Sequence, residues 1–418
     1  MARTSTPSPP RSSSRGHDDA AITTGRAVIA IIALSVGGFA IGTTEFMTMG
    51  VLPQIAESLG VSEPEAGHAI SAYALGVVVG VPVLSILGAR LPRKGLLLGL
   101  MGAYGLFNLV SAVATSYQMF TLARFFDGMP HGAYFGVASL VAAGLVQPQF
   151  RGRAVAGVLL GLSIANVIGV PASTWMGQIY GWRSTYLLAA GISALTVVLV
   201  MIFVPRTPRD RHANGLAEAK DFFRRRQVWL TMGAGAVGFG GLFAIYSYIA
   251  TTVTDVGGLA ASTVPIFLLA FGLGMTVGTW LAGELARWSI RKSLLLGSAG
   301  SAVVMVLFWV VIPAGWWALP VLFLVTAVSS ILVTNLQLRL MDVAGDAVTL
   351  GAAMNHASLN LANALGAWTG GLVITAGLGY RTPSLVGAAM ALLGAAILLF
   401  AFRLEDNQPA STRSGRSR

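Results

Sequence analysis

The chain has 418 residues, of which 55% are hydrophobic and 10% charged, and its mean hydropathy is +0.74. Soluble domains carry roughly 25% charged residues, so this composition excludes a water-soluble globular fold. The formal net charge of +11 could indicate a nucleic-acid partner, and the positions of the basic residues have to decide that question. The absence of cysteine excludes disulfides and thiolate metal sites.

Residues 1–25 are rich in Ser, Thr, Pro and Arg, which is typical of a disordered tail. From Ala27 onward, apolar runs alternate with short polar breaks. A helix needs about 20 apolar residues to cross a bilayer, and each run supplies them. The sequence therefore predicts an all-α membrane protein with twelve transmembrane helices, at about 27–51, 66–89, 95–115, 118–145, 154–180, 184–204, 228–250, 263–286, 293–312, 316–338, 349–376 and 383–403.

The basic residues give the orientation of these spans. If the N-terminus lies inside, only Arg183 and Arg381 of the 27 basic residues fall in outer loops, and Arg124 falls within a span. Cytoplasmic loops of membrane proteins carry such an excess of Lys and Arg. We therefore expect both termini in the cytoplasm of a multi-pass protein of the bacterial plasma membrane. The basic charge then faces membrane lipid, and a nucleic-acid partner is not expected.

An internal repeat divides the chain into two similar halves. Four short patterns recur after 197 or 198 residues: Gly76/Gly80 with Gly274/Gly278, Arg93-Lys94 with Arg291-Lys292, Asn166/Gly169 with Asn363/Gly366, and Gly181/Arg183 with Gly379/Arg381. Repeats of an even number of spans are parallel, as in one large transporter class. We predict two pseudo-symmetric six-helix bundles at 26–204 and 228–403. They are joined by a cytoplasmic linker at 205–227 and flanked by cytoplasmic tails at 1–25 and 404–418.

The motifs resemble those of a known family over about 27–403. They are Gly42-Thr-Thr-Glu45-Phe-Met, Arg124-Phe-Phe-Asp127-Gly128-Met-Pro-His131-Gly132, Asn166-Val-Ile-Gly169-Val-Pro171 and Met354-Asn-His356 through Asn363-Ala-Leu-Gly366. Together they resemble the twelve-helix drug:proton antiporters of the major facilitator superfamily, in the branch of arabinose-efflux-permease-like and chloramphenicol-resistance exporters. The resemblance implies a monomeric, proton-coupled exporter of a small amphiphilic drug or sugar-like compound that works by alternating access. It implies neither an enzyme nor a cofactor or metal.

Glu45 lies inside the first predicted span. A carboxylate at the bilayer centre costs about 2.5–3.5 kcal/mol on insertion scales, and such residues mark proton or substrate pathways. We expect Glu45 to couple protons or to contact substrate. The alternative is an acid held ionised by a structural partner.

Three ionisable residues share one face of the span at 118–145. Arg124, Asp127 and His131 are spaced by three and four residues, and a rise of 1.5 Å per residue puts Arg124 and Asp127 at the depth of Glu45. An ion pair between the first and fourth spans is therefore geometrically possible. In the family the matching arginine tunes a proton-binding acid, and Asp127 is a second candidate acid. The alternative is that Arg124 and Asp127 simply neutralise each other. His131 is either a proton relay or a structural histidine.

Polar side chains of the second half complete the predicted cavity. His356, Asn360 and Asn363 share a helix face, and Asn166 is the first-half match of Asn363. Polar groups inside a membrane bundle either contact substrate or join helices. We expect these four to line the substrate cavity.

The loop after the second span, which contains Arg90, Arg93 and Lys94, resembles the cytoplasmic gating signature of the superfamily. It has Ala89 where an Asp is usual, and that Asp forms the gating salt bridge. In the second copy of this loop, which contains Arg291, Glu284 is the candidate acid. These five charged residues are the predicted gating group.

Two other functions have to be weighed. The same fold carries proton-coupled uptake of nutrients, and the residues alone do not give the direction of transport. A membrane enzyme or sensor would require a catalytic cluster or a large extramembrane domain, and the sequence has neither. It also lacks a GxxxxGK[ST] phosphate loop, so ATP-driven pumping is not expected.

Overall fold

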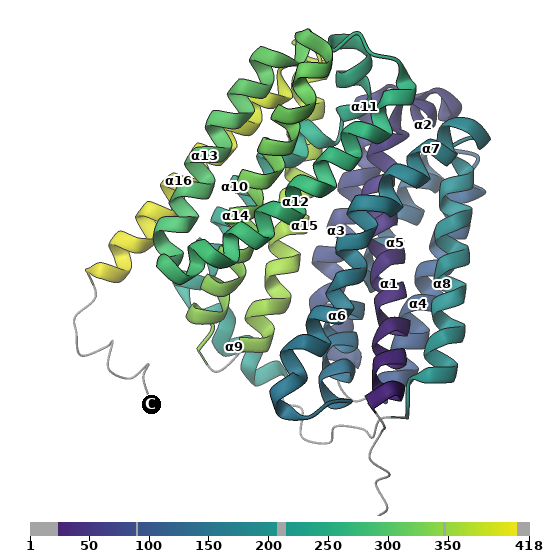
Figure 1. Ribbon diagram of the computed structural model, residues 1–418, viewed down its shortest axis with the longest axis vertical. Helices are drawn as coiled ribbons and strands as arrows, with labels where there is room; N and C mark the ends of the chain where they lie inside the picture. Colours follow the sequence, from purple (N-terminus) through teal and green to yellow (C-terminus); the bar gives the residue numbers. More distant parts are fainter. Residues whose placement is uncertain (1–23, 89–90, 207–214, 346–347, 408–418) are drawn as a thin grey trace, which may run out of the picture.

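The computed structural model describes residues 24–88, 91–206, 215–345 and 348–407. The predicted tail at 1–25 falls almost wholly outside these ranges, as does most of the tail at 404–418. In the described residues every regular element is a helix. Figure 1 shows the helices in two groups that lie side by side, with α2, α7 and α11 at one end of the molecule and α9 at the other. We call these the α11 end and the α9 end.

The first group holds the helices that precede residue 204. They are α1 (Thr24–Gly50), α2 (Leu52–Leu59), α3 (Glu63–Gly88), α4 (Arg93–Ala112), α5 (Tyr117–Gly144), η1 (Pro148–Phe150), α6 (Arg151–Ile164), η2 (Ala165–Gly169), α7 (Val170–Tyr180) and α8 (Arg183–Phe203). Helix η2 is a π-helical turn that joins α6 to α7. Pro171 follows it and has no backbone N–H to donate one turn back, which favours such a local widening of the helix.

The second group follows α9 (Gly215–Arg224), which lies within the predicted linker. Its elements are α10 (Arg226–Tyr246), α11 (Ile249–Thr251), η3 (Thr252–Val256), η4 (Ala261–Thr263), α12 (Val264–Trp288), α13 (Ile290–Val311), η5 (Ile312–Trp317), α14 (Ala318–Val343), α15 (Val348–Thr375) and α16 (Pro383–Asp406). The span predicted at 228–250 is therefore two helices, α10 and α11, broken at Ser247 and Tyr248. Helix α16 continues three residues past its predicted end at 403, so the C-terminal tail begins later than expected.

The duplication predicted from the sequence recurs in the packing. A Cβ built on Gly76 would lie 2.0 Å from the carbonyl oxygen of Phe125, and one on Gly274 would lie 2.5 Å from that of Phe323. The two partner residues, Phe125 and Phe323, are 198 positions apart, as are the two glycines. Helix α3 therefore crosses α5 at the same point at which α12 crosses α14. In the same way, a Cβ built on Gly80 would lie 2.2 Å from the carbonyl oxygen of Met129, and one on Gly278 would lie 2.1 Å from that of Ala327. Small residues at these crossings let the helix backbones touch, as is usual in membrane helix packing.

The outer surface of the molecule is strongly apolar. Large side chains on both groups are more than half exposed, among them Leu122, Ile202, Trp280 and Val303. Soluble monomers rarely expose contiguous apolar surface of this kind. Nine stretches of the described residues are long and apolar enough to cross a membrane, and one of them, Ile290–Val343, runs through both α13 and α14. The number of membrane crossings stays a prediction, but the composition of the surface is that of a protein in lipid.

Candidate functional site

The buried charged side chains of the described residues lie almost entirely in the first group. Glu45 on α1 and Arg124 and Asp127 on α5 are at most 7% exposed, and in the second group only Arg339 of α14 is comparable. His131 is buried beside them. Buried charges require partners because desolvation is costly, so the contacts of each group define the chemistry of this centre.

Arg124 is paired with Asp127, its neighbour one turn along α5. The second oxygen of Asp127 accepts a hydrogen bond from Asn108 Nδ2 of α4 at 2.8 Å. The guanidinium carbon of Arg124 lies 4.3 Å from the centroid of the Tyr73 ring and 5.4 Å from that of Tyr186, within cation–π range. Arg124 and Asp127 thus form an ion pair within α5, and their part in proton coupling stays a prediction.

Glu45 faces His131 and not Arg124, the partner with which the sequence predicts a possible ion pair. In the described residues it makes no ion pair with Arg124, and its Oε2 lies 4.0 Å from Nε2 of His131. The reason is geometric: Asp127 is one turn from Arg124 on the same helix, and the guanidinium lies over Tyr73. The shared depth of Glu45 and Arg124 is therefore not a direct contact.

His131 is held by a chain of hydroxyl groups that the sequence motifs do not indicate. Its Nδ1 lies 3.0 Å from the hydroxyl of Tyr73, which lies 3.1 Å from that of Tyr104. The Tyr104 hydroxyl donates to the carbonyl of Ile41 at 3.3 Å. All three side chains are buried. The signal that could have found the two tyrosines, and Asn108, is a hydrogen-bonding group inside an apolar span.

His131 also leads toward the second group through an aromatic ring. Phe135, one turn further along α5, lies with its ring edge-on to His131, with ring centroids 5.5 Å apart. On its other side Phe135 stacks on His356 of α15, with centroids 5.7 Å apart and planes within 4°. The two histidines are thus separated by one phenylalanine across the contact between the groups.

The predicted cavity amides are buried, and several of their atoms have no hydrogen-bond partner in the described residues. These are Oδ1 of Asn166, Oδ1 of Asn360 and both amide atoms of Asn363. Asn360 donates only to the carbonyl of His356, on its own helix. Buried polar groups are normally satisfied by protein, water or ligand, and a role of these amides in substrate binding stays a prediction.

Of the predicted gating residues that the structure describes, Lys94, Glu284 and Arg291 contact three different sets of partners. Arg90 lies outside the described residues, and Arg93 begins α4. Lys94 Nζ donates to the carbonyl of Met201 on α8 at 2.8 Å. Glu284 pairs on the surface with Arg287 at 3.4 Å. Arg291 binds two acids at the end of α16, Glu405 at 2.9 Å and Asp406 at 2.8 Å, so Glu284 is not its partner.

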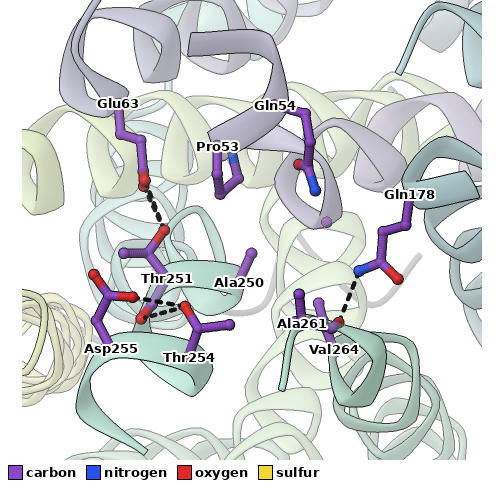
Figure 2. A pocket seen from close by; sticks show the side chains of 11 residues that line it. Pro53, Gln54, Glu63, Gln178, Ala250, Thr251, Thr254, Asp255, Ala261 and Val264 are labelled. Carbon is purple, nitrogen blue, oxygen red and sulfur yellow. Dashed lines mark hydrogen bonds between the residues drawn. The ribbon is translucent and has the colours of Figure 1, made fainter. Parts of the chain in front are cut away.

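At the α11 end, a cavity of about 170 Å³ lies between the two groups. Figure 2 shows Glu63 of α3 and Thr251 of α11 pointing toward each other across it. The Thr251 hydroxyl lies 2.8 Å and 2.6 Å from the two carboxylate oxygens of Glu63. Gln178 of α7 donates to the carbonyl of Ala261 at 2.8 Å. Hydrogen bonds therefore join the two groups at this end.

An all-helical, internally duplicated molecule with an apolar surface and a buried ionisable centre defines a polytopic membrane protein of the secondary-transporter class. Comparison with known families agrees: residues 34–355 match the Major Facilitator Superfamily profile. The chain therefore belongs to the Major Facilitator Superfamily.

Similar proteins cover nearly the whole chain. It is 36% identical over 383 residues to the inner membrane transport protein YdhP of Escherichia coli (strain K12), covering 91% of this chain and 96% of that protein. It is 32% identical over 384 residues to the chloramphenicol resistance protein of Streptomyces lividans, covering 88% of this chain and 94% of that protein. The fold is also that of a bacterial homologue of the human lysosomal transporter Spinster, crystallised inward-facing and unoccupied. That likeness has a TM-score of 0.72 and 14% identity, over 93% of this chain and 100% of the other.

These findings confirm the family and the exporter branch that the motifs indicated. The protein is a transporter of small molecules and not an enzyme, and it is a multi-pass protein of the bacterial plasma membrane.

Proposed function

We propose that this protein is a proton-coupled antiporter that exports a small amphiphilic compound by alternating access. The observation that carries the proposal is the pair formed by Glu45 and His131, two ionisable groups buried 4.0 Å apart inside the first group. Intramembrane acids and histidines commonly form proton relays. Phe135 and His356 extend this pair to the contact between the groups, where a change of protonation can bias their arrangement.

The proposed topology has twelve membrane crossings, six in each bundle, with both termini in the cytoplasm. The α9 end then faces the cytoplasm and the α11 end faces outward. The few basic residues of the α11 end, such as Arg183 and Arg381, support this orientation. In it, the hydrogen bonds of Glu63 and Gln178 close the outer side of a site that would open toward the cytoplasm.

The energetics of one proton are sufficient for useful export. Inward movement of one charge yields about 2.3 kcal/mol per 100 mV of membrane potential. A tenfold uphill concentration step costs about 1.4 kcal/mol. One proton per molecule would therefore sustain extrusion against at least a tenfold gradient.

The substrate class rests on the relatives and on the amides of the predicted cavity. We propose an antibiotic-like compound such as chloramphenicol, or a sugar-like metabolite, because one relative is named for chloramphenicol resistance and another is named a probable sugar efflux transporter. Asn166, Asn360 and Asn363 would bind its polar groups, while the surrounding apolar side chains take its hydrophobic part.

Everted membrane vesicles test direction and coupling together. With an acidic lumen, a proton antiporter that exports accumulates labelled chloramphenicol inside the vesicles, whereas a proton-coupled importer depletes it. The Glu45→Gln variant should abolish accumulation while the protein remains folded in the membrane. Glu57→Gln, an exposed carboxylate on α2, is the matched control. Accumulation that Glu45→Gln leaves unchanged would transfer the coupling role to Asp127.

A further inference from the structure

Tyr73 of α3 touches both ionisable pairs of the buried centre. Its hydroxyl lies 3.0 Å from Nδ1 of His131, the partner of Glu45. The face of its ring lies 4.3 Å from the guanidinium carbon of Arg124, the partner of Asp127. The side chain is 1% exposed and lies at the crossing of α3 and α5. One buried tyrosine thus links two acids that the ion-pair geometry leaves separate.

The direction of the hydrogen bonds around Tyr73 is constrained. A tyrosine hydroxyl has one hydrogen to donate, and a backbone carbonyl only accepts. Tyr104 either donates to the carbonyl of Ile41 and accepts from Tyr73, or donates to Tyr73, because either hydroxyl can be the donor between them. Tyr73 must then give its own hydrogen either to Tyr104 or to Nδ1 of His131. These are two distinct arrangements of the same side chains.

We infer that Tyr73 is a positioning residue that determines which nitrogen of His131 carries the proton, and so what His131 presents to Glu45. When Tyr73 donates to Tyr104, Nδ1–H of His131 donates to Tyr73, and Nε2 is an acceptor that suits a protonated Glu45. When Tyr73 donates to Nδ1, Nε2–H suits an ionised Glu45. The two arrangements differ by one proton, the one on Glu45. The inference rests on the proposed function, which makes Glu45 the proton carrier.

The distance from Nε2 to Glu45 fits a switch of this kind. At 4.0 Å the two atoms are about 1 Å too far apart for a hydrogen bond, so a small movement of α1 against α5 makes or breaks it. The ring of His131 itself is held by Tyr73 and Phe135 and need not turn. The tyrosine would therefore change the proton position without moving the imidazole.

Other ionisable groups face this centre and have to be held constant in any test. From the elements packed against His131 and Glu45 they are Tyr104 of α4, Arg124 and Asp127 of α5, Tyr186 of α8, Tyr246 of α10 and His356 of α15. Replacing a tyrosine by phenylalanine removes one oxygen and adds no charge, so Tyr73→Phe leaves each of these groups in place, and Tyr104→Phe removes only the Tyr104 hydroxyl among them.

The position of the proton on His131 is directly measurable. Protein labelled with ¹⁵N-histidine and reconstituted in lipid gives separate solid-state NMR signals for Nδ1–H and Nε2–H imidazoles. The chain has five histidines, and His131→Gln identifies the signals of this one. Spectra over a pH series then report the ratio of the two neutral forms in the full-length protein, without any substrate.

Two variants should move this ratio in different ways. Tyr104→Phe removes the competing acceptor, so the hydrogen of Tyr73 goes to Nδ1 and His131 shifts to the Nε2–H form. Tyr73→Phe removes the partner of Nδ1. The ratio of the two neutral forms of His131 should then no longer change with pH, or should change at a different pH. Tyr134→Phe is the control, because this buried hydroxyl donates to the carbonyl of Leu34 and, among the described residues, forms no hydrogen bond with a charged side chain. Its spectrum should match the parent.

The inference is overturned if Tyr104→Phe leaves the ratio of the His131 forms as in the parent, or if folded Tyr73→Phe does. Should Tyr73→Phe not fold, Tyr104→Phe decides alone. Failure of the proposed function is separate: it shows as everted vesicles that deplete chloramphenicol or do not accumulate it when their lumen is acidic. In that case the NMR result still reports whether Tyr73 directs the proton on His131.

Discussion

The carboxylate of Glu63 accepts the hydroxyl hydrogen of Thr251, with oxygen–oxygen distances of 2.8 Å and 2.6 Å, and so ties α3 of the first group to α11 of the second. The two residues are 188 positions apart in the chain. Their contact lies at the rim of the cavity of the α11 end, beside the hydrogen bond from Gln178 to Ala261. Any conformation that opens this end has to break both contacts.

Thr251→Val should therefore make the α11 end easier to open. A hydrogen bond to a charged group contributes about 1.5–3 kcal/mol, and the half-buried position favours the lower value, so we expect about a tenfold rise in the open population. The chain has no cysteine, so a single cysteine placed at Gln54, which lines this cavity, reports opening by its rate of labelling with a charged thiol reagent. Thr263→Val, whose hydroxyl bonds within its own turn, should label at the parental rate. If the cysteine in Thr251→Val were labelled as slowly as in the parent, the contact between Glu63 and Thr251 would not be what holds this end closed.

Most of the fold could be predicted from the sequence because bilayer-length apolar runs define helices almost by themselves. The repeat of Gly76 and Gly80 at Gly274 and Gly278 also carried packing information, since all four lie at matching helix crossings. The break between α10 and α11 was missed, because Ser247 and Tyr248 carry no proline or glycine signal. Nothing in the local sequence marks the point where the helix ends.

The sequence identified the ionisable residues of the candidate site but not which of them contact each other. Helical spacing placed Arg124, Asp127 and His131 on one face, yet it could not tell that Glu45 would approach His131 rather than Arg124. Equal depth in the membrane fixes one coordinate and leaves the rotation of each helix open. For the same reason the sequence did not bring Arg291 together with Glu405, which lies 114 residues away at the end of a different helix.

The pairing of Arg124 with Asp127 predicts a difference between the two acids. Asp127→Asn leaves a guanidinium that is 1% exposed without its counter-charge, and breaking a buried pair costs about 3–5 kcal/mol. We expect a clear fall in the thermal unfolding temperature of the purified protein in detergent. Glu45→Gln removes no ion pair with Arg124 and should unfold close to the parent temperature. If Asp127→Asn were as stable as the parent and lost transport, Asp127 would be the proton carrier instead of a structural partner.

The ion pairs of Arg291 predict that, of two acids at the α9 end, Glu405 contributes to stability and Glu284 does not. Glu405 contacts both Arg291 and Arg339, and Arg339 is only 5% exposed. Glu405→Ala should cost about 2 kcal/mol, because it leaves hydrogen-bond donors of a buried arginine unsatisfied. Glu284→Ala breaks only an exposed pair with Arg287 and should stay within about 0.5 kcal/mol of the parent. Thermal unfolding of the two variants side by side checks the contrast, and equal losses would contradict it.

Gly272 predicts how closely the two groups must approach for the α11 end to close. A Cβ at this position of α12 would lie 2.2 Å from the carbonyl oxygen of Asn166 in η2, and backbone atoms cannot yield as a flexible side chain does. Gly272→Ala should therefore push α12 away from η2 at a cost of about 1–3 kcal/mol, and raise labelling of the cysteine at Gln54 about tenfold or more. Gly283→Ala, on the same helix with no atom within 4 Å of the added carbon, should leave labelling unchanged. Parental labelling in Gly272→Ala would mean that α12 and η2 are not in contact when the α11 end is closed.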